Sequence, residues 1–345
     1  MVLGGIGQFA PGDENHLSQL SVGVDVGGTK MAAAAVSGTT IVETHERPTV
    51  LTSGQQLVDE IERAAREVID RAGMPVAVGV GVPSQIDFAS GLVVTSVNIP
   101  LAGLNLRQEL GERLGLPVYV DNDANCAALA EAYLAVDGPA QHLLMYTVGT
   151  GVGGGVVIDG HVFRGATGLG AELGHVVIDA NGPECPGNCP NRGCMEALCS
   201  GLALERDATR LGHKKPGSPL GRIVAEHGRV TGRQTVAAAR EGDPDAVDLM
   251  EKLGTWLGVG ISNAINAFEP QAIVIGGGLS VAGDLFMPRA IEEARSRALP
   301  ALVPHVRIEL ARGGPAAGVI GAALLAAQEQ AAASTETQTA NEGVL

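Results

Sequence analysis

The segment from Val120 to Glu196 carries three sequence patterns in a fixed order. It contains VDNDANCAALAE from Val120, VGTGVGGGVVIDGHVFRGATGLGAELGH from Val148, and CPGNCPNRGCME from Cys185. The first pattern supplies carboxylates and amides, the second a glycine-rich loop between apolar stretches, and the third three closely spaced cysteines. Together they predict a general base, a phosphate-binding loop and a metal site.

Strands, glycine turns and helices alternate on both sides of this segment. The apolar strand pattern of Ser21–Val26 precedes a glycine turn, an amphipathic helix is expected near Gln55–Arg71, and a buried strand near Val76–Val82. A second series begins with the strand pattern of Leu143–Val148 and is mostly helical from Glu196 to Phe268. Two such α/β series in a chain of 345 residues predict two domains with a cleft between them.

Composition excludes several classes of partner. The net charge of −15, without any basic run, opposes binding to nucleic acid. The sequence has neither a signal-peptide pattern nor a run of about 18 apolar residues, so no membrane association is expected. Five cysteines, three of them within Cys185–Cys194, favour a reducing compartment and metal ligation over disulfides. We therefore predict a cytoplasmic protein that binds small molecules.

Three glycine-rich turns follow apolar strands and are candidates for holding phosphate groups. The first, Asp25–Lys30, reads equally well as an ordinary hairpin turn with Lys30 as a solvated charge. The second, Gly149–Gly154, matches G-x-G-x-x-G, but a strand pattern follows it, whereas a dinucleotide fingerprint must begin a helix. The third follows Ala272–Ile275, and no Walker A sequence occurs. The candidate phosphate- and nucleotide-binding residues are Asp25, Gly27, Gly28, Thr29, Lys30, Gly149, Thr150, Gly151, Gly276, Gly277 and Gly278.

Three cysteines and one histidine have the spacing of metal ligands. The pattern Cys185-x3-Cys189-x4-Cys194, with His175 ten positions before Cys185, offers three thiolates and an imidazole for a closed tetrahedral zinc site. The alternative is a set of packed or free thiols, but the surrounding Gly, Pro and Asn residues cannot form a core. Cys126, in contrast, is expected to pack as a small apolar residue.

The order of these motifs resembles that of sugar kinases of the ROK family. The resemblance extends over about residues 21–325 and includes Gly23–Lys30 upstream and IGGGLS at Ile275–Ser280 downstream. It implies the two-domain fold of actin, Hsp70 and hexokinase, which is ribonuclease H-like. It also implies phosphorylation of the 6-hydroxyl of a hexose by ATP with Mg²⁺. Glucose is the expected hexose, because AELGH together with Glu196 favours an aldohexose.

The fold implied by this resemblance sets the domain boundaries. In that fold a last helix, at about residues 315–329 here, packs back on the first domain. We predict a disordered tail at residues 1–18, a small α/β domain at 19–135, a large α/β domain with the zinc loop at 136–314, and a disordered tail at 330–345. The family also implies a homodimer or homotetramer.

The resemblance assigns chemical roles to polar residues that have ordinary structural readings in isolation. Asp121–Asn125 follows a strand and starts a helix, where such residues cap free N–H groups, but the family's N-D-A-N motif carries the general base, which corresponds to Asp123. The implied sugar-binding residues are Asn98, Asn122, Asp123, Glu172, His175 and Glu196. The implied ligands of a structural zinc ion are His175, Cys185, Cys189 and Cys194. The family spacing is usually Cys-x-Cys-x4-Cys, so Cys199 is an alternative to Cys185.

Other functions within the same family stay open. Kinases for fructose, N-acetylglucosamine or N-acetylmannosamine share most of these residues, and relatives that use polyphosphate share the fold. A sugar-responsive repressor would need a helix-turn-helix of about 60 residues before Asp25, where this sequence has 24. A non-catalytic sugar sensor is opposed by the presence of Asp123. Ser84, in GVPS, and the long cysteine loop depart from the family pattern near the sugar side.

Overall fold

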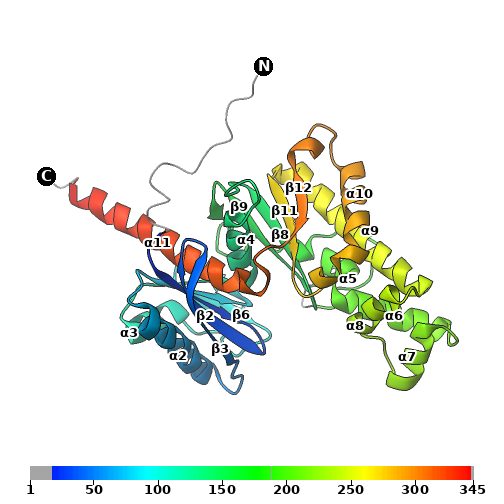
Figure 1. Cartoon of the computed structure of the whole chain (residues 1–345), viewed down its shortest axis with the longest axis horizontal. Coiled ribbons are helices and arrows are strands. Elements are labelled where there is room, and N and C mark those ends of the chain that lie inside the picture. The colour runs from blue at the N-terminus through cyan, green and yellow to red at the C-terminus, as the bar shows by residue number, and fades with distance from the viewer. Residues whose placement is uncertain (1–17, 188, 343–345) are drawn as a thin grey trace. The chain divides into compact units, whose positions relative to one another are not determined.

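The computed structural model describes residues 18–342 except residue 188 (Figure 1). The described residues form two compact units. The first contains the chain up to His142, Gly155–Ala171 and the chain from Arg312, and the second contains Leu143–Gly154 and Glu172–Ala311. The tail predicted at residues 1–18 lies outside the described residues except for Ser18.

The first unit contains a five-stranded sheet with the order β3-β2-β1-β4-β7. Its strands are β1 (Ser21–Val26), β2 (Lys30–Ser37), β3 (Thr40–Pro48), β4 (Val78–Val82) and β7 (Val118–Asn122), and its helices are α2 (Gly54–Ala72), α3 (Leu106–Leu114), α4 (Asp123–Tyr133) and α11 (Ala317–Glu342). A ribbon of β5 (Ser84–Asp87) and β6 (Leu92–Ser96) precedes α3. Strands β1, β4 and β7 are parallel, while β2 pairs antiparallel with both β1 and β3.

The second sheet has the order β10-β9-β8-β11-β12 and repeats this arrangement. Its strands are β8 (Leu143–Val148), β9 (Val152–Ile158), β10 (His161–Val162), β11 (Ala272–Gly276) and β12 (Arg307–Leu310). The accompanying helices are α5 (Met195–Cys199), α6 (Gly201–Lys214), α7 (Pro219–His227), α8 (Gly232–Arg240), α9 (Pro244–Phe268) and α10 (Met287–Arg297), with short 3₁₀ turns η1 (Leu173–His175), η2 (Ser280–Leu285), η3 (Val303–His305) and η4 (Gly314–Ala316). Strands β8, β11 and β12 are parallel. The predicted α/β fold with two related halves is confirmed, although the residues themselves show no repeat.

Alternation of valine and glycine in β1 decides how the first sheet is covered. Val22 and Val24 are fully buried in a cluster with Leu57 of α2. On the other face, a Cβ on Gly23 would overlap the carbonyl oxygen of Val319 in α11. Because side chains alternate between the faces of a strand, the valines form a core with α2, and Gly23 lets the backbone of α11 approach the sheet closely. Figure 1 shows α2 and α3 on one side of this sheet and α11 on the other.

The C-terminal helix is longer than the sequence predicted. The prediction ended it at about residue 329 and gave residues 330–345 as a disordered tail, but α11 continues to Glu342. The added stretch contains several alanine, glutamine and glutamate residues, which lose little conformational freedom in a helix, so it can extend a helix that is already packed. Residues 343–345 lie outside the described residues.

The unit boundaries also differ from the predicted ones at residues 135 and 314. The chain passes between units at His142–Leu143 and again at Ala311–Arg312, and Gly155–Ala171 belongs to the first unit. Gly155–Ala171 joins the first unit because Gly155 contacts α4 closely. A Cβ added to Gly155 would stand 2.6 Å from the carbonyl oxygen of Ala124 in α4. A pattern of strands and turns cannot reveal such a contact. No helix among the described residues has both the length and the apolar character needed to cross a membrane.

Candidate catalytic site

The junction between β7 and α4 presents the acidic residue expected to act as the base. Asn122 is the N-cap of α4, and its Oδ1 accepts hydrogen bonds from the N–H groups of Ala124 at 2.9 Å and Asn125 at 3.4 Å. Asp123 is the first helical residue, and its Oδ1 also accepts from the Ala124 N–H at 2.9 Å. The capping role therefore falls mainly on Asn122, while the carboxylate of Asp123 lies in the positive field of the helix N-terminus.

Asp25 lies close to Asp123 in the same unit. Burial raises the pKa of Asp25 to about 7, the negative charge of Asp123 adds to the increase, and Lys30 opposes it. Lys30 itself makes an ion pair of 2.7 Å with Glu46, and both side chains are more than half exposed. The Asp25 carboxylate also packs against Gly318 of α11, where a Cβ would stand 2.5 Å from Oδ2. The carboxyl groups of Asp25 and Asp123 thus repel each other when both are charged, and a bound cation would stabilise the charged form of both.

Asp25→Asn is expected to stabilise the protein increasingly as the pH rises. The Asp25 carboxyl ionises at its ordinary pKa of 3.8 in the unfolded chain but at about 7 in the folded protein. The stability that it contributes is therefore complete below about pH 4 and is lost as the pH rises to about 7. Asparagine imitates the neutral carboxyl and avoids this loss, which is about 1.4 kcal/mol per unit of pKa shift. Thermal unfolding across this pH range measures the gain.

The control for this experiment is Asp59→Asn. A hydrogen bond from Arg113 lowers the pKa of Asp59, so its loss should reduce stability at neutral pH, opposite in sign to the loss of Asp25. An Asp25→Asn variant with the same unfolding temperature as the wild type at pH 8 would contradict the raised pKa of Asp25.

A chain of hydroxyl groups connects Asn122 with the loop that carries Asn98. Asn98 is exposed on this loop after β6. The Oγ of Ser84 donates to the Oγ of Ser96 at 2.8 Å, and the latter donates to the carbonyl oxygen of Ile99 at 2.7 Å. The Asn122 side chain donates to the carbonyl oxygen of Ser84 at 3.2 Å. Ser84, singled out in the sequence as a departure, therefore anchors the loop that presents Asn98.

The first glycine turn forms a tight hairpin rather than an open loop. The Gly27 N–H donates to the Lys30 carbonyl at 3.0 Å, and Thr49 donates to both Thr29 and Gly27. Neither Gly27 nor Gly28 has a positive φ. A Cβ on Gly28 would meet nothing within 4 Å. The absence of a side chain at Gly28 therefore leaves open space above the turn, whereas a Cβ on Gly27 would stand 2.8 Å from the Lys30 carbonyl oxygen.

In the second unit the other two glycine turns meet. Strands β8 and β11 are parallel, so their carboxyl ends lie at one edge of the sheet. The N–H of Leu279 donates to the Val148 carbonyl at 2.9 Å, and a Cβ on Gly149 would lie 3.6 Å from the Gly278 nitrogen. Gly277 has a φ of 85°, a conformation that glycine adopts without strain. Together these turns form a continuous glycine-lined edge.

The N-terminus of α6 lies at the same edge and was not singled out from the sequence. The N–H of Gly201 donates to the Gly149 carbonyl at 2.8 Å, and that of Leu202 donates to the Thr150 carbonyl at 3.1 Å. Ser200 caps the helix by accepting from the Ala203 N–H at 3.1 Å. The signal was a serine before a helical stretch, which marks a helix start. A helix of 14 residues directs the positive end of its dipole toward the glycine turns.

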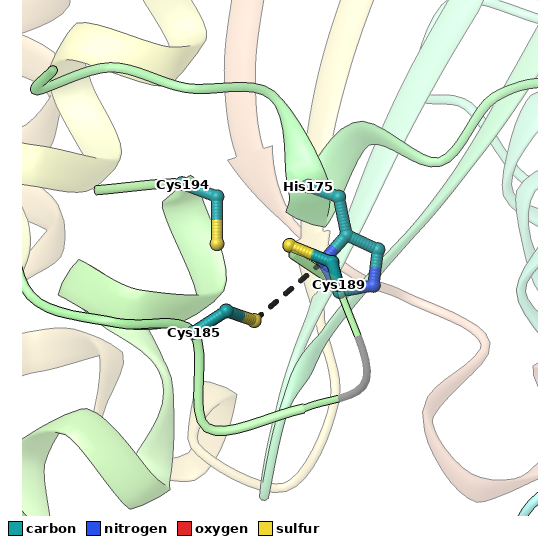
Figure 2. Close-up of side chains that lie close together, drawn as sticks. All are labelled: His175, Cys185, Cys189 and Cys194. Carbon is teal, nitrogen blue, oxygen red and sulfur yellow. Dashed lines mark hydrogen bonds between the residues drawn. The ribbon is translucent and has the colours of Figure 1, made fainter. Parts of the chain in front are cut away.

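The predicted metal ligands gather in the second unit (Figure 2). The imidazole of His175 and the thiols of Cys185, Cys189 and Cys194 offer ligand atoms that all lie within 4.8 Å of one another. His175 Nδ1 lies 3.8 Å from the Sγ of Cys185, and Figure 2 shows the other ring nitrogen turned away from Cys185 and Cys194. Cys199 is fully buried outside this cluster and donates to the Met195 carbonyl at 3.0 Å. Cys185 is therefore the third thiol of the cluster.

The donor set fits a soft divalent cation. Tetrahedral zinc bonds of about 2.0–2.3 Å bring ligand atoms within about 4 Å of one another, which small side-chain movements would achieve from the observed spacing. Burial raises the pKa of Cys185 to about 12 and also raises that of Cys194. Such thiols stay protonated without a cation, whereas a bound metal ion displaces their protons.

Three predicted sugar-binding residues converge on the start of β9. Glu172 directly precedes the short turn η1, and His175 is its last residue. Gly174 of this turn lies against β9, because a Cβ added to it would overlap the carbonyl oxygen of Val152. The carboxylate of Glu196 accepts from the Val152 N–H at 2.9 Å and lies 3.5 Å from the Sγ of Cys185. Glu196 thus connects the glycine turn of β8–β9 with the cysteine cluster.

The protein therefore has two α/β units, glycine-rich turns at the ends of strands, two neighbouring carboxylates and a cysteine–histidine cluster. The chain belongs to the ROK family, whose model matches residues 21–329. It is 34% identical over 317 residues to a glucokinase of Halalkalibacterium halodurans, covering 90% of this chain and 95% of that one.

Solved structures of the same family share the fold. A ROK hexokinase from Thermus thermophilus superimposes with a TM-score of 0.79 at 35% identity, over 90% of this chain and 98% of that one. A ROK glucokinase from Streptomyces griseus, solved in complex with glucose and AMPPNP, gives 0.74 at 33% identity, over 90% and 99%. The predicted hexokinase-like fold is therefore confirmed.

Proposed function

We propose that this protein is an ATP-dependent hexokinase that converts glucose to glucose 6-phosphate. The observation that carries the proposal is the position of Asp123, a carboxylate at the start of α4 beside Asp25, in a chain that belongs to the ROK family. The similar ROK glucokinase solved with glucose and AMPPNP supports both substrates.

Asp123 is proposed to act as the general base. It accepts the proton of the sugar 6-hydroxyl while the bond from that oxygen to the γ-phosphorus of ATP forms. The bond from phosphorus to the bridging oxygen breaks, and ADP leaves with the electron pair. Phosphoryl transfer through a loose transition state depends mainly on positioning and charge neutralisation, so this carboxylate needs correct geometry more than a shifted pKa.

The nucleotide is proposed to bind the glycine-lined edge of the second unit. The turns at Gly149–Gly151 and Gly276–Gly278 permit close approach of a ligand to the backbone, and the N-terminus of α6 favours an anion there. In the first unit, the Asp25–Lys30 turn and the carboxylate of Asp25 would hold Mg²⁺ and phosphate. Bound Mg²⁺ supplies positive charge to the phosphoryl oxygens.

A structural Zn²⁺ ion is proposed for the cluster of His175, Cys185, Cys189 and Cys194. Coordination through Nδ1 would fix the tautomer of His175 and leave its other ring nitrogen free to donate to a sugar hydroxyl. The remaining sugar contacts are assigned to Asn98, Asn122, Glu172 and Glu196. The protein is proposed to act in the cytoplasm, where thiols stay available to metal, as a homodimer or homotetramer.

The proposed function is tested by measuring ADP release with Mg-ATP. Glucose, mannose, fructose, N-acetylglucosamine and N-acetylmannosamine are compared at equal concentration, and polyphosphate is tried as the alternative donor. Glucose is expected to give the highest kcat/KM. A higher value for an N-acetylhexosamine would reassign the substrate, and absence of turnover with every sugar and both donors would contradict the proposal.

A further inference from the structure

A buried ion pair stands directly behind the Asn122–Asp123 junction. We infer that Asp121 and Arg164 are positioning residues, which hold Asn122 and Asp123 in place for phosphoryl transfer. This inference rests on the proposed function. Neither residue is among the sugar, nucleotide or metal ligands considered above, and Arg164 lies 43 residues from Asp121 in the sequence.

Asp121 is the last residue but one of β7, and its side chain is only 2% exposed. Its Oδ1 accepts from the Asn122 N–H at 2.7 Å and from the side-chain amide of Asn125 at 2.9 Å. Its Oδ2 accepts from Nε of Arg164 at 2.6 Å. One carboxylate therefore binds three groups, which are the N–H of the residue before the base, the side chain of the third residue of α4, and a guanidinium from another segment.

Arg164 follows β10, and besides Asp121 it contacts the Val162 carbonyl, Glu329 and Phe88. Its Nη2 donates to Glu329 of α11 at 3.1 Å, and its guanidinium lies 3.5 Å from the ring centroid of Phe88. The side chain is 16% exposed. The guanidinium is held by the ion pair with Glu329 and by the ring of Phe88 on one face, so it has little freedom to rotate. Arg164 can therefore fix the position of Asp121.

The charges around Cys126 indicate the same cluster. Cys126 is fully buried on α4, and burial raises its thiol pKa, with further increases from Asp121, Asp25 and Asp123. Arg164 lowers it. Arg164 is thus a cation that offsets a group of three carboxylates, two of which belong to the proposed reaction site.

Loss of this cation should disturb the reaction site more than the fold as a whole. Without Arg164, the Asp121 carboxylate is left buried without its charged partner, and it must move toward water or take up a proton. Movement of the carboxylate releases the Asn122 N–H and the Asn125 amide, which begin α4, and protonation weakens both hydrogen bonds because the acceptor loses its charge. Since a displacement of about 1 Å in a reacting group can cost about 100-fold in rate, kcat should fall while nucleotide binding changes little.

The test compares Arg164→Met, Asp121→Asn and the control Glu329→Gln. Glu329→Gln removes the charge of one partner of Arg164 but leaves the contact between Arg164 and Asp121. We expect kcat for glucose to fall about 10- to 100-fold in the first two variants, with KM for ATP within about threefold of wild type. Glu329→Gln should keep kcat within about threefold. Arg164→Lys should recover part of kcat, because an ammonium can replace the charge but not the fork of donors.

Amide hydrogen exchange of residues 120–128 provides a readout that does not depend on turnover. Exchange should be at least about 10-fold faster in Arg164→Met than in wild type or Glu329→Gln, because the first turn of α4 loses its anchor. If the wild type phosphorylates no sugar, the proposed function fails, while this exchange measurement still decides whether Arg164 orders Asn122 and Asp123.

The inference is overturned by either of two results. The first is wild-type kcat in Arg164→Met measured well below its unfolding temperature. The second is unchanged exchange at residues 120–128 alongside a general loss of stability, which would show a structural role only. If Arg164→Met does not fold, Asp121→Asn decides alone, because the amide keeps one oxygen for the Asn122 N–H and loses the charge and the acceptor oxygen that pair with Arg164.

Discussion

Asp123→Asn is expected to lower kcat for glucose phosphorylation by about 10²- to 10⁴-fold, because an amide cannot accept the proton of the attacking hydroxyl. KM for ATP should change little, because Asp123 is not among the residues proposed to bind the nucleotide and its phosphates. The fold should be retained, since Asn122 rather than Asp123 supplies the main cap of α4. Initial rates of ADP release at saturating glucose measure kcat.

The matched control is Asp70→Asn, the same chemical change at an exposed position of α2. It should leave kcat unchanged. A second consequence concerns Asp25, whose pKa is raised partly by the charge of Asp123. In Asp123→Asn that pKa should fall, so the pH-dependent loss of stability assigned to Asp25 should become smaller. Turnover within about threefold of wild type in Asp123→Asn would exclude Asp123 as the base.

Local sequence patterns predicted the elements that build the site. Strand β8 and the end of α9 at Phe268 coincide with the predicted Leu143–Val148 and Glu196–Phe268. These predictions succeed because apolar periodicity and glycine turns are local properties. The cysteine spacing likewise led to a four-residue cluster, since its ligands lie within a short segment and one turn of chain can bring them together.

Contacts between distant segments could not be predicted in this way. Arg164 reaches Asp121 across 43 residues, and Ser84 supports Asn122 across 38. Each contact depends on the packing of β7 against other elements, which no periodicity records. The choice between Cys185 and Cys199 was open for the same reason. It is resolved by the side chains, because α5 buries Cys199 against the Met195 carbonyl.

The extent of α11 shows a different limit. Composition predicted disorder after residue 329, because the segment is small and polar, yet the same residues favour helix once a packed helix precedes them. Nucleation is the costly step of helix formation, and the packing of α11 against α4 and β2 supplies it. The composition of residues 330–345 taken alone does not include the stabilising effect of the packed helix that precedes them.

Cys194→Ser is expected to abolish metal binding and to weaken glucose binding by about 10- to 100-fold. Cys194 is fully buried beside the other ligands, so a serine there removes one of three thiolates from a site of four donors. Without the ion, the turn that holds Glu172 and His175 loses its anchor, and the imidazole is free to rotate. Metal content by elemental analysis and glucose affinity by calorimetry measure the two effects separately.

Cys199→Ser is the matched control, because Cys199 lies on the adjacent helix, is equally buried, and bonds only a backbone carbonyl among its described contacts. Serine can keep that hydrogen bond, so zinc content and glucose affinity should both be preserved. AMPPNP affinity in Cys194→Ser then separates a local effect from a general one. If only the sugar side depends on the metal, AMPPNP binding should stay within about threefold of wild type. A zinc-free Cys194→Ser protein that binds glucose normally would show instead that the cluster stabilises its loop without orienting His175.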